Sequence, residues 1–186
     1  KNASVENNRI VFPDGMRYRL LVLPAEKAID LEVLRKLELL VKAGLTVIAP
    51  RPVKTSSLSG FPQSDIELKA IADRLWGAID GITVTENNYG KGKVVFGRDV
   101  NTVLKEMNVQ PDLSFTSTQQ NTGIDYIHRS SKDMDIYFVA NRFGRKGIND
   151  FEFRYLTSLP DRYEQVECRF RVTGKVPELW EPLTGE

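Results

Sequence analysis

The only histidine of the 186-residue chain, His128, lies among several carboxylates. Asp125 precedes it by three positions, and Asp133 and Asp135 follow it across a turn-like stretch. A histidine beside carboxylates can serve as a general acid, a general base or a metal ligand. We therefore take five residues as the candidate functional cluster of this sequence: Asp125, His128, Arg129, Asp133 and Asp135.

The same residues also have a structural interpretation, which the sequence favours. A zinc site needs three or four convergent ligands, and a small hydrolase would need His128 and its neighbouring aspartates to converge in a pocket with a nucleophile. Nothing in their spacing requires either arrangement. We expect His128 and Arg129 to be tied to local carboxylates or carbonyls. We assign no catalytic residue, no metal and no cofactor to the chain.

The other motifs that could indicate a nucleophile or a nucleotide site are also weak evidence for function. Cys168 is the only cysteine, and its place in an alternating strand favours a buried small hydrophobic side chain over a nucleophile. The stretch Val94–Phe96 leads into Gly97 with no serine or cysteine, so the nucleophile elbow of an amidotransferase is missing. No glycine-rich phosphate loop follows a predicted strand, which leaves nucleotide binding unsupported.

Composition excludes several further classes. Twenty-six Lys+Arg stand against 25 Asp+Glu, a net charge of +1 without the basic excess of a nucleic-acid-binding surface. The longest apolar runs, such as Leu20–Leu23 and Ile136–Ala140, are far shorter than the roughly 20 residues that cross a bilayer. We expect neither nucleic acid nor membrane as a partner. The chain begins at Lys1 rather than Met, which suggests a piece of a longer protein.

The first part of the chain alternates predicted strands with predicted helices. Ser64 and Glu67 have the spacing of a capping box and predict a helix over 64–79, and Asp99 is placed to cap another helix. This order predicts a mostly parallel sheet covered on both faces, a flavodoxin-like three-layer α/β domain over residues 1–111. The expected strands are 9–12, 17–23, 45–49, 82–85 and 93–96, with helices at 31–43, 64–79 and after 99, a loop over 51–63 and a turn over 87–92.

Beyond residue 111 the helical period disappears. The stretches 124–129 and 135–141 predict a hairpin, and 151–155 and 166–172 alternate apolar with polar residues, with a basic turn at 144–149. This pattern is typical of an antiparallel, sandwich-like β domain, here over 112–186 and expected to be incomplete. Its aromatic residues could line a carbohydrate surface, but alternation makes packing within the sheets the default.

Seven strings, taken in chain order, resemble one family. The similarity covers nearly the whole chain and is to the region that follows the catalytic barrel in α-L-rhamnosidase-like glycoside hydrolases of family 106. The strings are Tyr18–Pro24, Ala43–Ile48 with Pro50, Leu75–Gly77, Tyr89–Val94, Ile124–Arg129, Asp135–Asn141 and Val176–Pro182.

The resemblance implies a catalytic (β/α) barrel upstream, a domain like those of class I glutamine amidotransferases but without their chemistry, and β-sandwich domains. The family's catalytic carboxylates belong to the barrel, so the chain is expected to be a non-catalytic accessory fragment whose partners are the other domains of its parent. The resemblance also implies export to the periplasm or cell surface. Two alternatives stay open, a stand-alone carbohydrate-binding module and a small hydrolase using His128. A truncated β domain would leave sheet edges open to a second copy.

Overall fold

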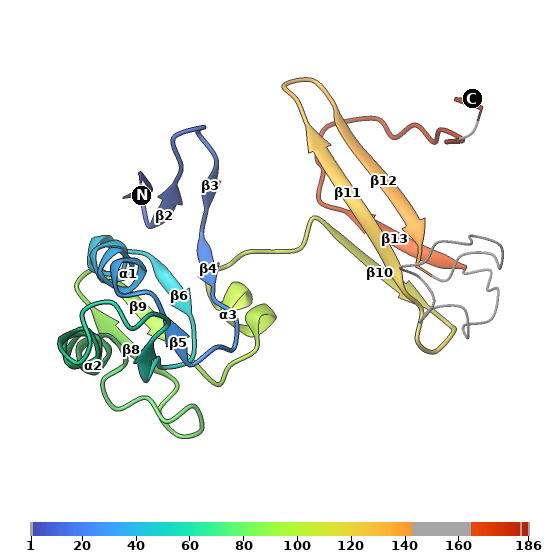
Figure 1. Ribbon diagram of the computed structural model, residues 1–186. Helices are drawn as coiled ribbons and strands as arrows, with labels where there is room; N and C mark the ends of the chain where they lie inside the picture. Colours follow the sequence, from blue (N-terminus) through green and yellow to red (C-terminus); the bar gives the residue numbers. More distant parts are fainter. Residues whose placement is uncertain (1, 143–164, 183, 186) are drawn as a thin grey trace. The chain divides into compact units, whose positions relative to one another are not determined.

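The computed structural model describes residues 2–142, 165–182, 184 and 185 (Figure 1). The chain divides into two compact units, Lys1–Asn108 and Val109–Glu186, called unit 1 and unit 2 below. The predicted turn at 144–149 and strand at 151–155 lie outside the described residues.

A four-stranded sheet forms the centre of unit 1. Its strand order is β4 (Leu20–Val22), β6 (Thr46–Ile48), β9 (Gly92–Val95) and β8 (Glu86–Tyr89). The first three strands run parallel and β8 pairs with β9 antiparallel. The expectation of a mostly parallel sheet in this part of the chain is confirmed.

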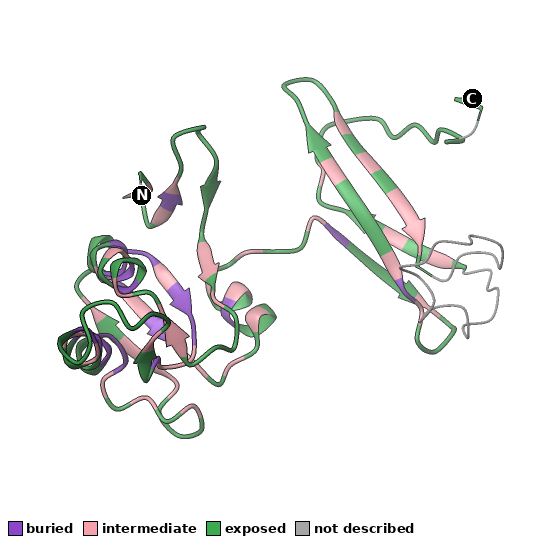
Figure 2. Cartoon of the chain, in the orientation of Figure 1, coloured by how far each residue is buried: buried purple, intermediate pink, exposed green. Residues whose placement is uncertain are grey.

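Helices cover both faces of this sheet. The helices α1 (Leu31–Ala43) and α2 (Gln63–Trp76) share a core with Val47 and Val94, whereas Ile48 and Val95 pack with α3 (Val100–Glu106). Neighbouring strand residues point to opposite faces, so adjacent positions feed the two cores. Figure 2 shows that the buried residues lie mainly on these elements.

The capping box predicted for α2 is wrong. The helix begins at Gln63, after Pro62, so Ser64 lies inside the first turn instead of preceding it. The backbone N–H of Ser64 donates to the carbonyl of Gly60 at 2.9 Å, and Glu67 pairs with Arg35 of α1. The cap of α3 is as predicted, because Asp99 accepts hydrogen bonds from the first turn of that helix.

The strand predicted over Ile82–Thr85 is also wrong. The carboxylate of Asp80 accepts backbone hydrogen bonds from residues 82, 83 and 84, which holds this stretch as a turn. The strand is β8, at the position where a polar turn was expected. An edge strand tolerates polar residues, and Asn87 uses its side chain to donate to the carbonyl of Leu75.

Two smaller sheets complete unit 1. An antiparallel sheet holds β1 (Ser4–Glu6), β2 (Arg9–Val11) and β3 (Arg17–Tyr18). A short parallel pair joins β5 (Ala28–Ile29) to β7 (Lys54–Thr55), within the segments that lead into α1 and α2.

Unit 2 is built from antiparallel strands. The predicted hairpin is confirmed as β11 (Ile124–Ser130) and β12 (Asp135–Asn141). A second pair joins β10 (Leu113–Ser117), which the sequence pattern did not reveal, to β13 (Val166–Phe170). Leu113 is the one hydrophobic residue buried among the described residues of this unit. Within the described ranges, no helix has the length and apolar character that a bilayer crossing requires.

Candidate functional site

His128 lies on one face of the β11–β12 hairpin, directly opposite Tyr137. Alternate residues of a strand share a face, so the register places Asp135 on the same face as His128. Asp125 and Arg129 differ from His128 by an odd number of positions and lie on the opposite face. Of the candidate residues in the two strands, only Asp135 is therefore placed to contact the imidazole ring of His128.

Two carboxylates flank the imidazole. Its Nε2 lies 2.8 Å from Oδ1 of Asp135, and its Nδ1 lies 3.3 Å from Oδ2 of Asp112, just before β10. A neutral imidazole donates from one nitrogen only, so both contacts are hydrogen bonds at once only in the imidazolium form. His128 therefore links the hairpin to the segment that enters the second strand pair.

Each carboxylate also has a cationic partner from the segment after β13. Lys175 Nζ lies 2.5 Å from the second oxygen of Asp135, and Arg171 donates to Asp112. The side chains of His128 and Asp135 are 18% and 15% exposed, which limits access of a substrate to their polar atoms. The cluster, called the His128 cluster below, consists of Asp112, His128, Asp135, Tyr137, Arg171 and Lys175.

These contacts favour the ionised form of both carboxylates. The hydrogen bond from Lys175, followed by those from His128 and Ser130, holds the pKa of Asp135 well below its ordinary value. For Asp112 burial acts to raise the pKa, but hydrogen bonds from His128 and Arg171 outweigh it, and the pKa is lowered. Neither carboxyl is poised to release or take up a proton near neutral pH.

Two aromatic rings pack beside the imidazole, one directly against it and the other against the first ring. The ring of Tyr137 stacks on His128 with centroids 4.1 Å apart and planes 8° apart, and Phe170 meets Tyr137 edge-on at 4.8 Å. The Tyr137 hydroxyl is buried and has no hydrogen-bond partner among the described residues. Burial raises the pKa of Tyr137, and the negative charges of Asp112 and Asp135 add to this effect.

Three of the candidate residues from the sequence lie outside the His128 cluster. Asp125 pairs with Arg142 at 2.6 Å, and Asp133 is exposed in the turn between the hairpin strands. Arg129 is exposed, with its guanidinium 3.5 Å from the carbonyl oxygen of His128. Four members were missed: Asp112, Tyr137, Arg171 and Lys175. The cross-strand register could have revealed Tyr137. Asp112 and Lys175 come from segments without a strand or helix pattern, and Arg171, expected at the end of the strand 166–172, follows the last residue of β13.

Cys168 is half-buried in β13, opposite Phe115 of β10. Burial raises the pKa of its thiol, which keeps the sulfur protonated and a poor nucleophile at neutral pH. In the part of the chain that the structure describes, no three His, Cys, Asp or Glu side chains are placed to hold a metal ion.

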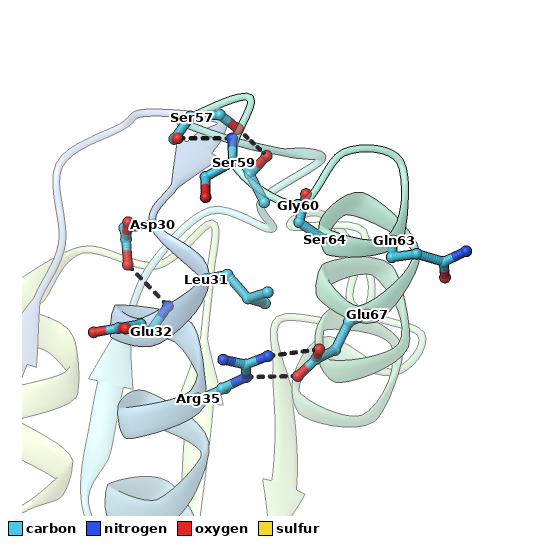
Figure 3. Close-up of a pocket in the computed structure, with 11 residues that line it drawn as sticks. Asp30, Leu31, Glu32, Arg35, Ser57, Ser59, Gly60, Gln63, Ser64 and Glu67 are labelled. Atoms are coloured by element: carbon cyan, nitrogen blue, oxygen red, sulfur yellow. Dashed lines mark hydrogen bonds and ion pairs between the residues drawn. The ribbon is translucent and has the colours of Figure 1, made fainter.

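A separate cavity of about 370 Å³ lies in unit 1 between the first turns of α1 and α2 (Figure 3). Arg35 and Glu67 form a bidentate ion pair across it, with N–O distances of 2.6 and 2.7 Å. Hydroxyl and acidic side chains supply most of the remaining lining. The sequence pattern gave no sign of this cavity, because the segment 51–63 was interpreted only as a loop.

Comparison with known proteins links the chain to glycoside hydrolases. The family model described as alpha-L-rhamnosidase, of glycoside hydrolase family 106, matches residues 1–186. A Formosa agariphila protein named "Putative beta-glucuronidase" is 33% identical over 183 residues, which are 97% of this chain and 13% of that protein. The solved structure of a rhamnosidase from Novosphingobium sp. PP1Y superposes with a TM-score of 0.77 at 31% identity, over 99% of this chain and 16% of that one.

The chain thus spans only about one seventh of the length of these relatives. The resemblance drawn from the seven sequence strings is confirmed by a match over the full 186 residues. The chain belongs to the alpha-L-rhamnosidase family of glycoside hydrolases.

Proposed function

We propose that the chain is a non-catalytic accessory segment of a longer glycoside hydrolase of the rhamnosidase type, and that it scaffolds the catalytic part of that enzyme. The family match over the whole chain and the small share of each relative that it covers support this role. Acid and base carboxylates for glycoside hydrolysis would then lie elsewhere in the longer protein.

The observation that carries the proposal is the internal pairing of the His128 cluster. Asp112 and Asp135 each bind His128 on one side and a cation from residues 171–175 on the other. A general acid must reach a substrate with its proton, whereas these groups direct their hydrogen bonds at one another. The arrangement instead connects three segments of unit 2, which is what a structural junction does.

Activity measurements test the proposal. The 186-residue chain and the longer protein are assayed side by side on a panel of aryl glycosides that includes an α-L-rhamnoside. We expect turnover by the longer protein only, and His128→Ala in that protein should leave kcat within about twofold. Turnover by the 186-residue chain that is lost in His128→Ala would establish the rival hypothesis, a small hydrolase acting through His128.

The proposal extends to the domain organisation. Residues 1–111 would be a reduced flavodoxin-like domain of the amidotransferase type, a role supported by the parallel strands β4, β6 and β9 with helices on both faces. Residues 112–186 would be part of a β-sandwich, supported by the contact of Tyr137 in one strand pair with Phe170 in the other. The partners would be the remaining domains of the longer enzyme. The edges of the two-stranded sheets in unit 2 would suit pairing with a second copy of the chain.

Export is part of the same proposal. A polysaccharide-degrading enzyme meets its substrate outside the cytoplasm, and membership of a glycoside hydrolase family supports a periplasmic or cell-surface location. The single cysteine of this chain is compatible with that oxidising environment.

A further inference from the structure

Unit 2 has very little hydrophobic core of its own. Leu113 is the one hydrophobic residue that is buried among its described residues, and the other buried hydrophobic residues of the described chain lie in unit 1. The described strands of unit 2 form two-stranded sheets. A two-stranded sheet is at most marginally stable in water unless further apolar surface packs against it. The strands of unit 2 therefore need additional apolar cover.

The β10–β13 pair of unit 2 has one polar face. Four polar side chains share this face: Ser114, Thr116, Glu167 and Arg169. The opposite, apolar face of the pair carries Phe170, which contacts Tyr137 of the β11–β12 hairpin. The pair therefore has an inner face against the hairpin and an outer face whose polarity suits contact with water.

The outer face of the β11–β12 hairpin is apolar instead. Its inner face carries His128 and Tyr137, and the residues that alternate with them point to the opposite side. Three large apolar side chains on that side are about half exposed, Ile127 at 56%, Ile136 at 52% and Phe138 at 53%, and Figure 2 shows exposed positions in both strands. This surface, called the hairpin outer face below, consists of Asp125, Ile127, Arg129, Ile136, Phe138 and Ala140.

The three large apolar side chains are neighbours. Ile127 and Phe138 are direct cross-strand partners, and Ile136 lies two positions from Phe138 on the same strand. Side chains in these relative positions are only about 5–8 Å apart, so they form one continuous patch. A continuous exposed apolar patch is typical of an interaction surface.

The sequence of β12 supports the same conclusion. Its five residues from Ile136 to Ala140 are all apolar or aromatic, whereas β13 alternates apolar with charged residues. Strands that are covered on both faces have such continuous apolar runs, and strands with one face in water alternate. The composition of β12 therefore suits a strand with cover on its outer face as well as on its inner face.

Charged groups border the apolar patch. Asp125 and Arg142 form an exposed ion pair at 2.6 Å near one end of the hairpin, and Arg129 is exposed near the other end. An apolar centre within a charged, solvent-accessible rim is the usual composition of an interface between protein surfaces. The hairpin outer face has this composition.

The small size of the hairpin outer face favours a partner within the same polypeptide. A stable contact between separate molecules takes about 20–30 residues from each side, far more than this face offers. Tethering within one polypeptide raises the effective concentration of the partner to roughly the millimolar range, so a small face is then sufficient. More than four fifths of each matched relative lies outside the part that this chain covers, so the longer protein has ample further chain to supply the partner.

We propose that the hairpin outer face is the docking surface for another part of the same longer polypeptide, outside residues 1–186, which presents its own apolar surface to Ile127, Ile136 and Phe138. The contact is permanent and completes the core of unit 2. This proposal rests on the proposed function, because it treats the chain as a segment of a longer enzyme. It adds which surface of the segment holds another part of that enzyme, and it requires no catalysis by the chain.

Photo-crosslinking in the longer protein tests the proposal. Phe138 is replaced by p-benzoylphenylalanine, an aromatic residue that bonds to a neighbouring C–H group on irradiation, and mass spectrometry identifies the linked peptides. We expect a cross-link within one molecule, to a peptide outside residues 1–186. The same replacement of Thr116, on the polar outer face of β10, is the matched control and should cross-link roughly fivefold less, because water surrounds it.

Three outcomes of this experiment would overturn the proposal. A cross-link to a peptide within residues 1–186 would mean that the chain covers its own hairpin. A product of twice the mass would mean that a second copy covers it. Cross-linking at position 138 that is no more efficient than at position 116 would mean that the hairpin outer face stays in water.

A second pair of variants keeps the test decisive if the bulky cross-linker prevents folding. Ile127→Cys and Thr116→Cys are small changes, and peptide mass spectrometry measures how fast iodoacetamide labels each thiol in the longer protein. We expect labelling at position 127 to be about tenfold slower than at position 116 in the folded protein, and equally fast in urea. Equal rates in the folded protein would contradict the proposal.

Neither measurement depends on catalysis, so failure of this proposal can be distinguished from failure of the proposed function. If the expected cross-link is absent but the longer protein alone turns over glycosides, the accessory role stands and the docking surface is wrong. If the 186-residue chain turns over glycosides by itself, the accessory role is wrong whatever the cross-link shows.

Discussion

The imidazole of His128 lies flat on the ring of Tyr137, its cross-strand partner, with ring centroids 4.1 Å apart. The stack fixes the plane of the imidazole, and this plane directs its two nitrogens toward Asp112 and Asp135. The orientation of one ring therefore controls a junction between the hairpin, the start of β10 and the segment after β13.

Removing the imidazole should weaken unit 2. In His128→Ala both carboxylates lose a hydrogen-bonding partner and Tyr137 loses the ring stacked on it, so we expect the free energy of unfolding to fall by roughly 1–2 kcal/mol. Urea unfolding at pH 7 measures this change. Asp133→Ala, in the exposed turn of the same hairpin, is the control and should stay within about 0.5 kcal/mol of the parent chain. Equal stability of the two variants would mean that the His128 cluster contributes nothing to the fold.

Acid should weaken the same junction. Asp112 and Asp135 have lower pKa values in the folded chain than the value of about 3.9 for an unfolded aspartate, so they release protons more readily when folded. Their contribution to stability is complete above the unfolded pKa and is lost as the pH falls through the folded pKa values. We expect the free energy of unfolding to decline from about pH 5 downward.

A charge variant isolates this effect. Lys175→Met removes the largest cause of the lowered pKa of Asp135, so the slope of stability against pH below 5 should become shallower. Lys132→Met, in the exposed turn of the hairpin, serves as the control and should keep the slope of the parent chain. Identical slopes in all three chains would show that Lys175 does not hold the Asp135 carboxylate.

Only part of the His128 cluster could be predicted from the sequence. Once 124–129 and 135–141 are assigned to a hairpin, strand parity alone separates His128 from Asp125. Asp112 and Lys175 were out of reach, because Asp112 lies 16 positions from His128 and Lys175 lies 40 from Asp135, in segments without a periodic pattern. Such contacts depend on how sheets pack, and hydrophobic periodicity does not encode that packing.

The errors in unit 1 have a similar origin. The helices and the buried strands β6 and β9 were predicted close to their observed positions, because their apolar residues repeat with the period of the element. The single strand predicted over 17–23 is wrong, since the structure divides it into β3 and β4, which belong to two different sheets. Ser64 and Glu67 have the spacing of a cap, but the position of Pro62 moves the start of the helix, and spacing alone does not show this. The stretch 82–85 has strand-like residues, yet three backbone hydrogen bonds to Asp80 make it a turn.

The buried hydroxyl of Tyr137 should be dispensable for stability. Tyr137→Phe keeps the ring against His128 and removes a buried oxygen that has no hydrogen-bond partner among the described residues. We expect Tm to be equal to or higher than that of the parent chain. The pKa of Tyr137 is raised in the folded chain, so the parent loses stability as the pH rises through the unfolded value of about 10, and Tyr137→Phe should lose less. Thermal unfolding at pH 7 and pH 10.5 tests both statements, and a lower Tm at pH 7 would contradict the first.

The two tryptophans should differ sharply in their effects. Trp76 is fully buried at the end of α2 and donates from its indole nitrogen to the carbonyl of Ala49 at 2.9 Å, whereas Trp180 is 66% exposed. Trp76→Phe shrinks a packed side chain and leaves that carbonyl without its donor, so the free energy of unfolding should fall by about 2–3 kcal/mol. Trp180→Phe should change it by less than about 0.5 kcal/mol. Because each variant retains a single tryptophan, fluorescence also separates the two sites: the chain with Trp76 alone should emit at shorter wavelength and resist quenching by iodide. Equal quenching of the two variants would contradict the position of Trp76 in the core of unit 1.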